Sequence, residues 1–368
     1  MVKTDMMFDE GKLIHDTYEI DRFLGEGAFA EVYRVKHKFL GRQALKIFKS
    51  PSTSSKEIED KLSEAIILSR IGHPNIIRVF DAGVVETNIG NCGYFTMEYV
   101  AGGSLDSFWR SFGPKFVPIS DAVDITKQIC MGLSVAHSEK PPIIHRDIKP
   151  QNLLIGYDSN GLRVRIADFG LAKNVNQLTL LASARGTPAF KPPECLYNID
   201  SCAADVWAIG VTLYLLLTDR LPFPIESTLD FSSGRSFKHQ LSPASILNAQ
   251  VDDDLDAILS RCLEKKPEDR YPNATELLDD LVKWKPSERK LPQSPKVSVD
   301  QSKSVLGVQA KSDHIIAEKM VNEALNLSQN AGRLNEAADL MEEALNKSPR
   351  LRYKYEYQLK LWRRGIAR

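Results

Sequence analysis

The stretch HRDIKPQN, residues 145–152, places a carboxylate, an ammonium and an amide side chain close together: Asp147, Lys149 and Asn152. Asp147 can accept a proton from a hydroxyl group, and Asn152 offers an oxygen of the hard type that Mg²⁺ prefers. Asp168 of ADFG follows 21 residues after Asp147 and offers a second such oxygen. Together they predict a site that holds Mg²⁺ beside phosphates and acts on a hydroxyl group.

A glycine turn lies upstream, in LGEGAFAEVY, residues 24–33. Gly25 and Gly27 fall between two predicted strands, and their missing side chains let backbone N–H groups approach phosphate oxygens closely. The turn leads into a strand and not into a helix, which disfavours a dinucleotide-binding fold. By itself the turn decides little, because a hairpin glycine needs no ligand.

A lysine follows within an apolar strand, as Lys46 of ALKIF. A buried lysine needs a partner, because an unpaired buried charge is costly, and Glu64 of the next predicted helix offers one. Lys46 could equally lie on the solvent face of an edge strand. The sequence leaves both interpretations open.

The elements around these residues predict an α+β fold. Residues 18–100 read as short strands with one helix at 55–72, whereas longer helices follow Gly103, including 120–138 with Ser120 as the expected N-cap. The apolar run VWAIGVTLYLLL, residues 206–217, is too short to span a bilayer and predicts a buried helix. A small β-rich lobe before a larger helical lobe suggests a cleft between them.

In their order along the chain, the glycine turn, strand lysine, helix glutamate, HRDIKPQN and DFG resemble the eukaryotic-type protein kinase family, over about residues 15–284. The resemblance implies a bilobal kinase domain at 1–284, with an N-lobe at about 15–100 and a C-lobe at about 101–284. It implies ATP and Mg²⁺ as cofactors and protein substrates as partners. Lys149, two residues after Asp147, resembles the serine/threonine pattern.

The resemblance also implies a role for each matching residue. Asp147 orients the acceptor hydroxyl and Lys149 contacts the transferred phosphoryl group, as the catalytic pair, while Asn152 and Asp168 hold magnesium. In YFTMEYV, Met97 lies at the back of the adenine pocket, and the backbones of Glu98 and Val100 bond the adenine edge. Lys46 holds the α- and β-phosphates and pairs with Glu64. The implied ATP-binding residues are Leu24, Gly25, Glu26, Gly27, Val32, Ala44, Lys46, Glu64, Met97, Glu98, Val100, Asn152 and Asp168.

Downstream, GTPAFKPPE resembles the substrate-binding segment that closes the activation loop, which implies that Glu194 pairs with Arg270. Asp205 resembles the buried aspartate that braces the catalytic loop. In the activation loop, Thr179 and Ser183 carry hydroxyls, and a phosphate there could pair with Arg146 and order the loop.

Three positions depart from the family pattern: Ala30 replaces the third glycine, Pro192 begins PPE, and Gln151 stands where glutamate is common. None of them removes a catalytic group. The competing hypothesis is a kinase-like scaffold without phosphotransfer. It is disfavoured, because such scaffolds typically lack the lysine, one of the aspartates or the asparagine.

Beyond the kinase-like region, residues 285–312 predict a flexible linker and 313–368 a helical tail that includes a short hairpin. AGRLNEAADLMEEALNKSP, residues 331–349, resembles the second half of a tetratricopeptide repeat, although an ordinary helical hairpin fits equally well. Its apolar stripe needs a matching surface, so we expect the tail to recognise a partner or substrate.

Composition limits the remaining function classes. Lys and Arg number 48, as do Asp and Glu, so no net field favours nucleic acid or an anionic membrane. The five cysteines are scattered and suggest free thiols in a reducing compartment. The start MVKTDMMFDEGK does not resemble a signal peptide. The sequence therefore predicts a cytoplasmic protein without a membrane span.

Overall fold

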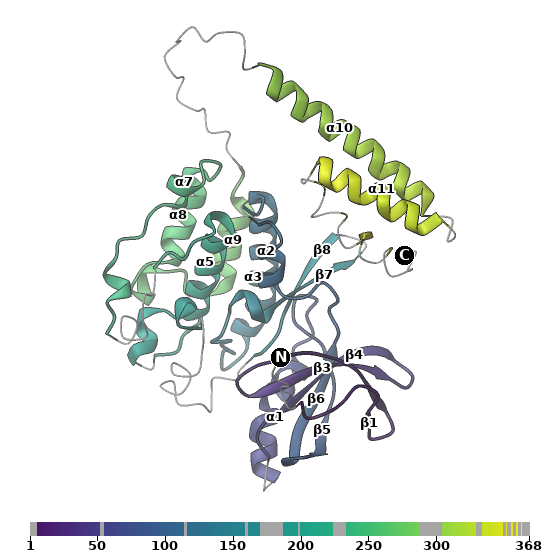
Figure 1. Ribbon diagram of the computed structural model, residues 1–368. Helices are drawn as coiled ribbons and strands as arrows, with labels where there is room; N and C mark the ends of the chain where they lie inside the picture. Colours follow the sequence, from purple (N-terminus) through teal and green to yellow (C-terminus); the bar gives the residue numbers. More distant parts are fainter. Residues whose placement is uncertain are drawn as a thin grey trace. The chain divides into compact units, whose positions relative to one another are not determined.

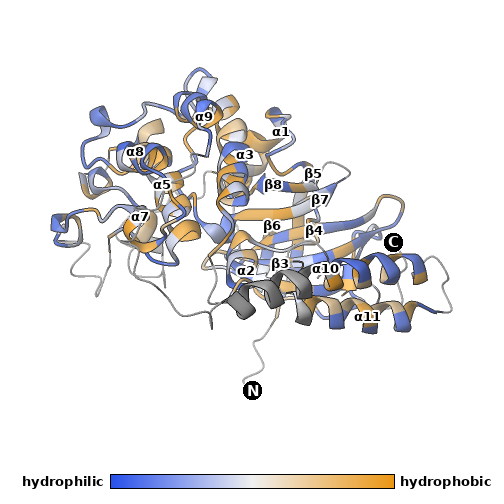
Figure 2. Cartoon of the chain, turned by 90° about the horizontal axis from the view of Figure 1, so that it is seen from above, coloured by the Kyte–Doolittle hydropathy of each residue, from blue (hydrophilic) through white to orange (hydrophobic). Residues whose placement is uncertain are grey.

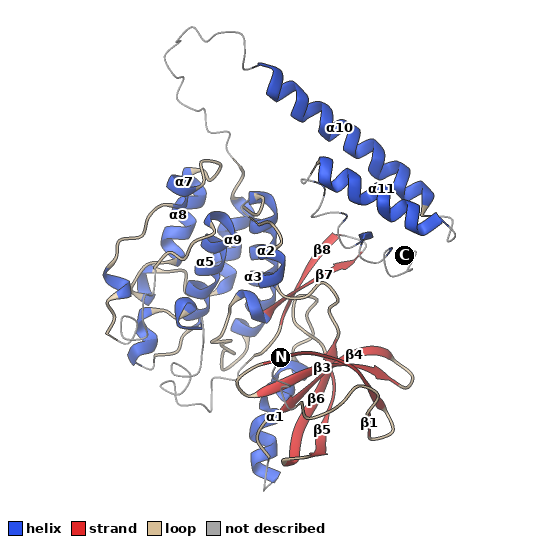
Figure 3. Ribbon diagram, viewed as in Figure 1, coloured by secondary structure: helices blue, strands red, loops and turns tan. Residues whose placement is uncertain are grey.

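The computed structural model describes residues 6–51, 55–113, 116–158, 161–169, 187–197, 199–223, 233–286, 304–328 and 333–348, together with Leu351, Tyr355, Gln358, Leu359 and Trp362. The chain divides into two compact units, Met1–Arg289 and Lys290–Arg368. In the first unit most strands gather in an N-terminal lobe and most helices in a C-terminal lobe (Figure 1, Figure 3). The first unit thus has the two lobes that the sequence predicts.

One antiparallel sheet forms the N-terminal lobe, with its strands in the order β1-β2-β3-β4-β6-β5. Their bounds are β1 Leu13–Ile14, β2 Tyr18–Glu26, β3 Ala30–His37, β4 Gly41–Phe48, β5 Val79–Thr87 and β6 Gly90–Glu98. In both β4 and β6, six consecutive residues are buried. A strand shows such a continuous run when both of its faces are covered.

Different residues cover the two faces of this sheet. Helix α1, Ser55–Arg70, contributes Ala65 and Leu68 to a cluster with Phe48 and Phe95. On the opposite face, Phe8 packs with alternate strand residues such as Leu45 and Ile47. The period of two along β4 therefore divides its side chains between two cores.

Helix α5, Cys202–Thr218, is the centre of the C-terminal lobe, and every residue from 205 to 218 is buried. A helix that is apolar on all sides must be enclosed by protein, so the predicted buried helix is confirmed. Around it lie α3 Ile119–Ser138, α7 Ala244–Leu247, α8 Asp253–Cys262 and α9 Ala274–Lys283, and the lobe also contains α2 Leu105–Arg110. Among the described residues, no helix is long and apolar enough to cross a membrane.

The N-cap of helix α3 lies two residues earlier than expected. Pro118 is its N-cap, and the amide of Ala122 donates to the Pro118 carbonyl at 2.9 Å. Ser120 therefore lies in the first turn, and the prediction that it caps the helix was wrong. The sequence SDAV offers a cap of the favoured residue type, but the backbone turns into the helix at the preceding proline.

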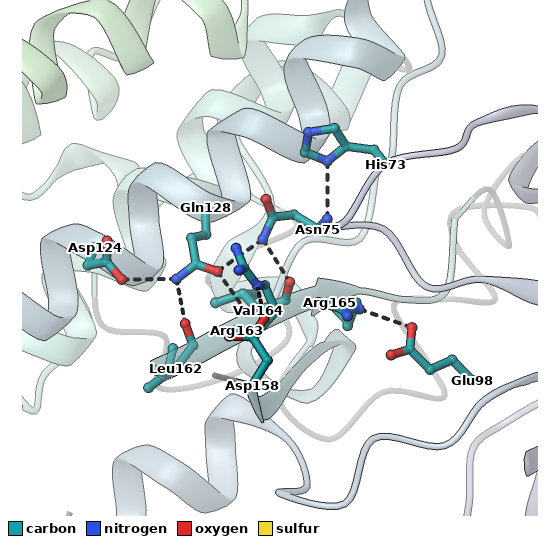
Figure 4. A network of polar contacts seen from close by, with 10 residues as sticks. All are labelled: His73, Asn75, Glu98, Asp124, Gln128, Asp158, Leu162, Arg163, Val164 and Arg165. Carbon is teal, nitrogen blue, oxygen red and sulfur yellow. Dashed lines mark hydrogen bonds and ion pairs between the residues drawn. The ribbon is translucent and has the colours of Figure 1, made fainter. Parts of the chain in front are cut away.

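A polar network joins the two lobes (Figure 4). The side-chain amide of Asn75 donates to Gln128 Oε1 of α3 and to the Val164 carbonyl of β8, Gly161–Ile166, each at 3.0 Å. Gln128 in turn donates to the Leu162 carbonyl at 3.0 Å. Asn75 and Gln128 are buried, so every bond replaces one to water and fixes β8 against both lobes.

The second unit contains α10, Ser304–Leu327, and α11, Leu334–Lys347, which lie side by side (Figure 1). Both helices carry hydrophilic and hydrophobic bands (Figure 2). Helix α10 starts nine residues before the expected position, 313. The segment VLGVQAKS contains no proline, so it can continue a helix. Residues 287–303 of the predicted linker lie outside the described part of the chain.

The apolar stripe of α11 is covered within its own unit. Leu334, Ala337, Ala338, Met341, Ala344 and Leu345 are all buried in one cluster. The same cluster contains Ala317, Val321 and Ala324 of α10, together with Leu351 and Trp362. The tetratricopeptide-like identity of this tail stays a prediction.

Candidate active site

Lys46 lies in the interior of the sheet, between Val32 of β3 and Phe95 of β6. Its side chain is 3% exposed, and Nζ lies 2.7 Å from Oδ1 of Asp168. The sheet order excludes the alternative of a lysine on a solvent-facing edge strand. The ion pair joins the N-terminal lobe to the segment that follows residues 161–166 in the C-terminal lobe.

The predicted partner Glu64 lies on α1, but its side chain is outside the described residues. Among the described side chains, Asp168 is a partner of Lys46. Burial alone would raise the pKa of Asp168, but the ammonium of Lys46 lowers it below its ordinary value. Asp168 is therefore held as a carboxylate.

Asp147 is the centre of the second cluster. Lys149 Nζ lies 2.7 Å from its Oδ2, and Asn152 Nδ2 donates to the same oxygen at 3.0 Å. Asn152 also donates to the Asp147 carbonyl at 2.8 Å. The three residues that the sequence singled out in HRDIKPQN therefore do lie together.

The loop that carries Asp147 is hydrogen-bonded to Asp205 of the buried helix α5. Its carboxylate accepts hydrogen bonds from the amides of His145 at 2.7 Å and Arg146 at 2.8 Å, and contacts His137 Nε2 at 3.1 Å. Burial would raise the pKa of Asp205, but the bonds to His137 and His145 hold it below its usual range. Asp205 thus fixes the loop as the sequence predicts.

His145 links this loop to the DFG segment. Its Nε2 lies 2.9 Å from the Ala167 carbonyl, while the amide of Asp147 donates to Nδ1 at 3.2 Å. One ring nitrogen must therefore donate and the other accept, which fits a neutral imidazole. Complete burial lowers the pKa of His145 and favours the same form. Its ring also packs on Phe169, with centroids 4.5 Å apart.

Pairing of two strands brings the two predicted metal ligands near each other. Asn152 precedes β7, Leu153–Asp158, and Asp168 follows β8, and the amide of Ala167 donates to the Asn152 carbonyl at 2.9 Å. The amide nitrogen of Asn152 bonds Asp147, which leaves its amide oxygen as the candidate ligand. Two hard oxygens fit a Mg²⁺ ion that takes its other ligands from phosphate and water. The described residues contain no closed cluster of three or more His, Cys, Asp or Glu ligands.

The predicted ATP-binding residues of the first lobe lie on neighbouring strands. Leu24, Gly25 and Glu26 end β2, and Gly27 follows, with its amide bonded to the Ala30 carbonyl at 2.8 Å. An added Cβ at Gly25 would meet nothing within 4 Å, so the turn is open rather than packed. The remaining members are Val32 of β3, Ala44 of β4, Met97 and Glu98 at the end of β6, and Val100 just beyond it.

Within that set, the side chain of Glu98 contacts the second lobe. Its Oε2 lies 3.0 Å from Nε of Arg165 on β8 (Figure 4). The Glu98 amide donates to the Arg78 carbonyl at 2.8 Å. Glu98, at the end of β6, is therefore held by its side chain to the C-terminal lobe and by its amide to Arg78.

Two charged residues near Asp147 were missed in the sequence. Lys191 Nζ lies 2.5 Å from the Arg146 carbonyl and 3.9 Å from Oδ1 of Asp147. Asp200 accepts a hydrogen bond from Nε of Arg146 at 2.8 Å. Lys191 lies inside the motif GTPAFKPPE, but no spacing rule indicates that it reaches the catalytic loop. Thr179 and Ser183 lie outside the described residues, so the phosphate switch stays a prediction.

The expected pair of Glu194 and Arg270 is present and buried. Two guanidinium nitrogens bond the two carboxylate oxygens at 2.6 and 2.8 Å. Arg270 also donates to the carbonyls of Glu264 and Lys265, and it lies over the ring of Trp207 at 4.8 Å. This bidentate pair fastens the segment after the activation loop to the C-terminal lobe.

Comparison with known proteins decides the family. The family model of the protein kinase domain matches residues 18–284, which is most of the chain. The chain belongs to the protein kinase family. A protein named as a probable serine/threonine-protein kinase of Clostridium acetobutylicum is 32% identical over 276 residues, which is 74% of this chain and 40% of that protein.

The chain is also similar to other kinases in sequence and in fold. PknB of Mycobacterium leprae, a serine/threonine-protein kinase, is 31% identical over 300 residues, which is 80% of this chain and 46% of PknB. The crystal structure of the PknI kinase domain of Mycobacterium tuberculosis superposes with a TM-score of 0.55 at 26% identity, covering 75% of this chain and 99% of that one. This chain spans less than half the length of these two curated relatives. Both curated relatives are named as serine/threonine-protein kinases.

Replacing Arg270 with Met should destabilise the kinase domain by about 3–5 kcal/mol, because Glu194 is then buried without a partner. Urea unfolding of both proteins measures the loss. Lys283→Met, which alters an exposed ion pair with Asp280, is the control and should change stability by less than about 0.5 kcal/mol. The double variant Glu194→Gln, Arg270→Met should recover part of the loss. Similar stabilities for the Arg270→Met and control proteins would contradict this role.

Proposed function

We propose that this chain transfers the γ-phosphoryl group of Mg-ATP to serine or threonine hydroxyls of protein substrates. The observation that supports it is the convergence of Lys46 with Asp168, and of Asp147 with Lys149 and Asn152, on a protein kinase fold. These residues come from three separate parts of the chain. A kinase-like scaffold would not need all of them together.

The chemistry asks mainly for positioning and charge neutralisation, because the transition state of phosphoryl transfer is loose. A carboxylate is far too weak a base to deprotonate serine outright, so Asp147 aims the hydroxyl and takes its proton late. Lys46 neutralises charge on the α- and β-phosphates, and Lys149 neutralises charge on the γ-phosphoryl group during its transfer. Asn152 and Asp168 would hold magnesium, which neutralises charge on the phosphates when bound.

We place the protein in a reducing, cytoplasmic environment. All five cysteines are free in the structure, as such a compartment favours. The balanced charge gives no reason to expect a nucleic-acid partner.

Replacing Asp147 with Asn should lower transfer of radiolabelled phosphate to a generic Ser/Thr acceptor by at least about 10²-fold, because the hydroxyl loses its proton acceptor. Lys46→Met should lower the transfer to a similar extent, because the ATP phosphates lose the ammonium that neutralises their charge. Asp279→Asn, on the exposed face of α9, is the control and should keep full activity. Equal melting temperatures would show that all variants are folded. An Asp147→Asn protein as active as the wild type would sink the assignment.

The proposal includes control by the activation loop. In the structure Asp200 bonds Arg146, the residue that a loop phosphate would address. A phosphate carries more charge and more acceptor oxygens than a carboxylate, so it can compete for this guanidinium.

Mass spectrometry of purified active protein should find phosphate on Thr179 or Ser183. The double alanine variant should lose about tenfold in activity, since one charge-assisted hydrogen bond contributes about 1.5–3 kcal/mol. Phosphatase treatment of the wild type should cause a similar loss. A dephosphorylated enzyme with full activity would refute loop control.

The proposal also assigns the tail to recognition of a partner or substrate. No predicted ATP or magnesium residue lies beyond Asp168, and the tail forms a compact unit of its own. Since the apolar stripe of α11 is covered inside this unit, recognition would use its outer polar faces.

Truncation after Trp284 should leave phosphorylation of a generic acceptor within about threefold of the full chain, and reduce phosphorylation of the true partner much more. Trp284 is kept because its indole N–H donates to Asp252 of the kinase domain at 3.0 Å. Comparing initial rates on both substrates gives the answer. Loss of all activity would make the tail part of the catalytic fold.

A further inference from the structure

We propose that Lys191 is a positioning residue for phosphotransfer: it holds the catalytic loop and flanks the carboxylate of Asp147. This role rests on the kinase activity proposed above. Lys191 lies between two 3₁₀ turns, η2 Thr187–Phe190 and η3 Pro193–Tyr197, at the start of the segment that Glu194 fastens.

The backbone of Lys191 is held on both sides. Its amide donates to the Pro188 carbonyl at 3.1 Å. Pro192 and Pro193 follow, and proline restricts both its own backbone and that of the residue before it. Glu194 is then buried against Arg270. The side chain of Lys191 therefore extends from a fixed base.

Its first contact is with the backbone of the catalytic loop. Nζ donates to the carbonyl of Arg146 at 2.5 Å, and that carbonyl belongs to the peptide bond that leads into Asp147. Arg146 has φ of 68°, a left-handed conformation that is unfavourable for a residue with a side chain. Asp205 holds this residue through its N–H and Lys191 holds it through its C=O. The orientation of Asp147 is therefore fixed from both ends of Arg146.

Its second contact is with the carboxylate itself. Asn152 and Lys149 both approach Oδ2 of Asp147, at 3.0 and 2.7 Å. Lys191 lies on the side of Oδ1, at 3.9 Å. This distance is too long for a hydrogen bond but short enough for attraction between charges. Oδ1 can thus accept a substrate hydroxyl while the ammonium beside it attracts the carboxylate and orients it.

An ordinary surface lysine would not show these features. Lysine is rarely buried, and it normally keeps its charged end in water. The Lys191 side chain is only 18% exposed, and its ammonium is directed at a carbonyl and a carboxylate.

The test compares Lys191→Met, Lys191→Gln and Lys191→Arg in the full chain, with the exposed Lys238→Met as control. Met removes both contacts and should lower kcat by about 10- to 100-fold, the scale expected from a misplaced catalytic group. KM for ATP and the Kd for ADP should not change, because the contacts of Lys191 are with Arg146 and Asp147, which are not among the predicted ATP-binding residues. Gln keeps a donor for the Arg146 carbonyl without the charge and should give an intermediate kcat. Arg keeps the donor and the charge and should restore most of kcat.

Several results would overturn the role. They are a Met or Gln variant with wild-type kcat, a Met variant with raised kcat (which would mean that Lys191 obstructs the acceptor), or an Arg variant as slow as Met at equal melting temperature. If the Met variant fails to fold, the Gln and Arg variants decide alone. An active wild type beside an equally active Met variant overturns only this role. A wild type no more active than Asp147→Asn overturns the proposed function as well.

Discussion

The buried carboxylate of Asp205 is the constraint on which the active site depends. A charge inside an apolar helix is costly unless it is hydrogen-bonded, and here the bonds come from the backbone of His145 and Arg146 and from the ring of His137. Those bonds hold Arg146 in a left-handed conformation that the loop would not adopt alone. Because α5 is enclosed on every side, the carboxylate cannot move to relieve the strain. The direction of Asp147 follows from that fixed point.

A second set of contacts positions the N-terminal lobe against the site. The hydrogen bonds of Asn75 and Gln128 fasten β8 between the lobes, and β8 ends just before Asp168. Lys46 then reaches Asp168 from the interior of the sheet. Residues separated by more than a hundred positions meet because each lies at the end or middle of a rigid strand. His145 joins the two sets of contacts, since it bonds Ala167 and Asp147 together.

Much of this arrangement could be predicted from the sequence, because the motifs have fixed local spacing. Asp147, Lys149 and Asn152 lie within a few residues, so one loop conformation brings them together. The position of Lys46 could not be decided locally, since only the order of the strands shows whether β4 is an edge. Pairs such as Lys191 with Arg146 depend on how distant segments pack, and no periodicity indicates them. The start of α10 was missed for another reason: a segment without proline can be either linker or helix.

The charged side chains of the site divide into a fixed set and an exchangeable set. Arg270 donates several directed bonds, and Asp205 accepts one bond from each of two backbone amides, so a change at either residue would leave buried groups unsatisfied. Lys46 and Lys149 instead carry compact charges on flexible stems, which can pass from a carboxylate to a phosphate at little cost. Arg270 therefore lies in the fixed set, whereas Lys46 and Lys149 lie where phosphate groups would enter and leave in the proposed reaction. Lys191 combines both features, because its base is fixed by prolines and its ammonium is shared between the Arg146 carbonyl and the reactive carboxylate.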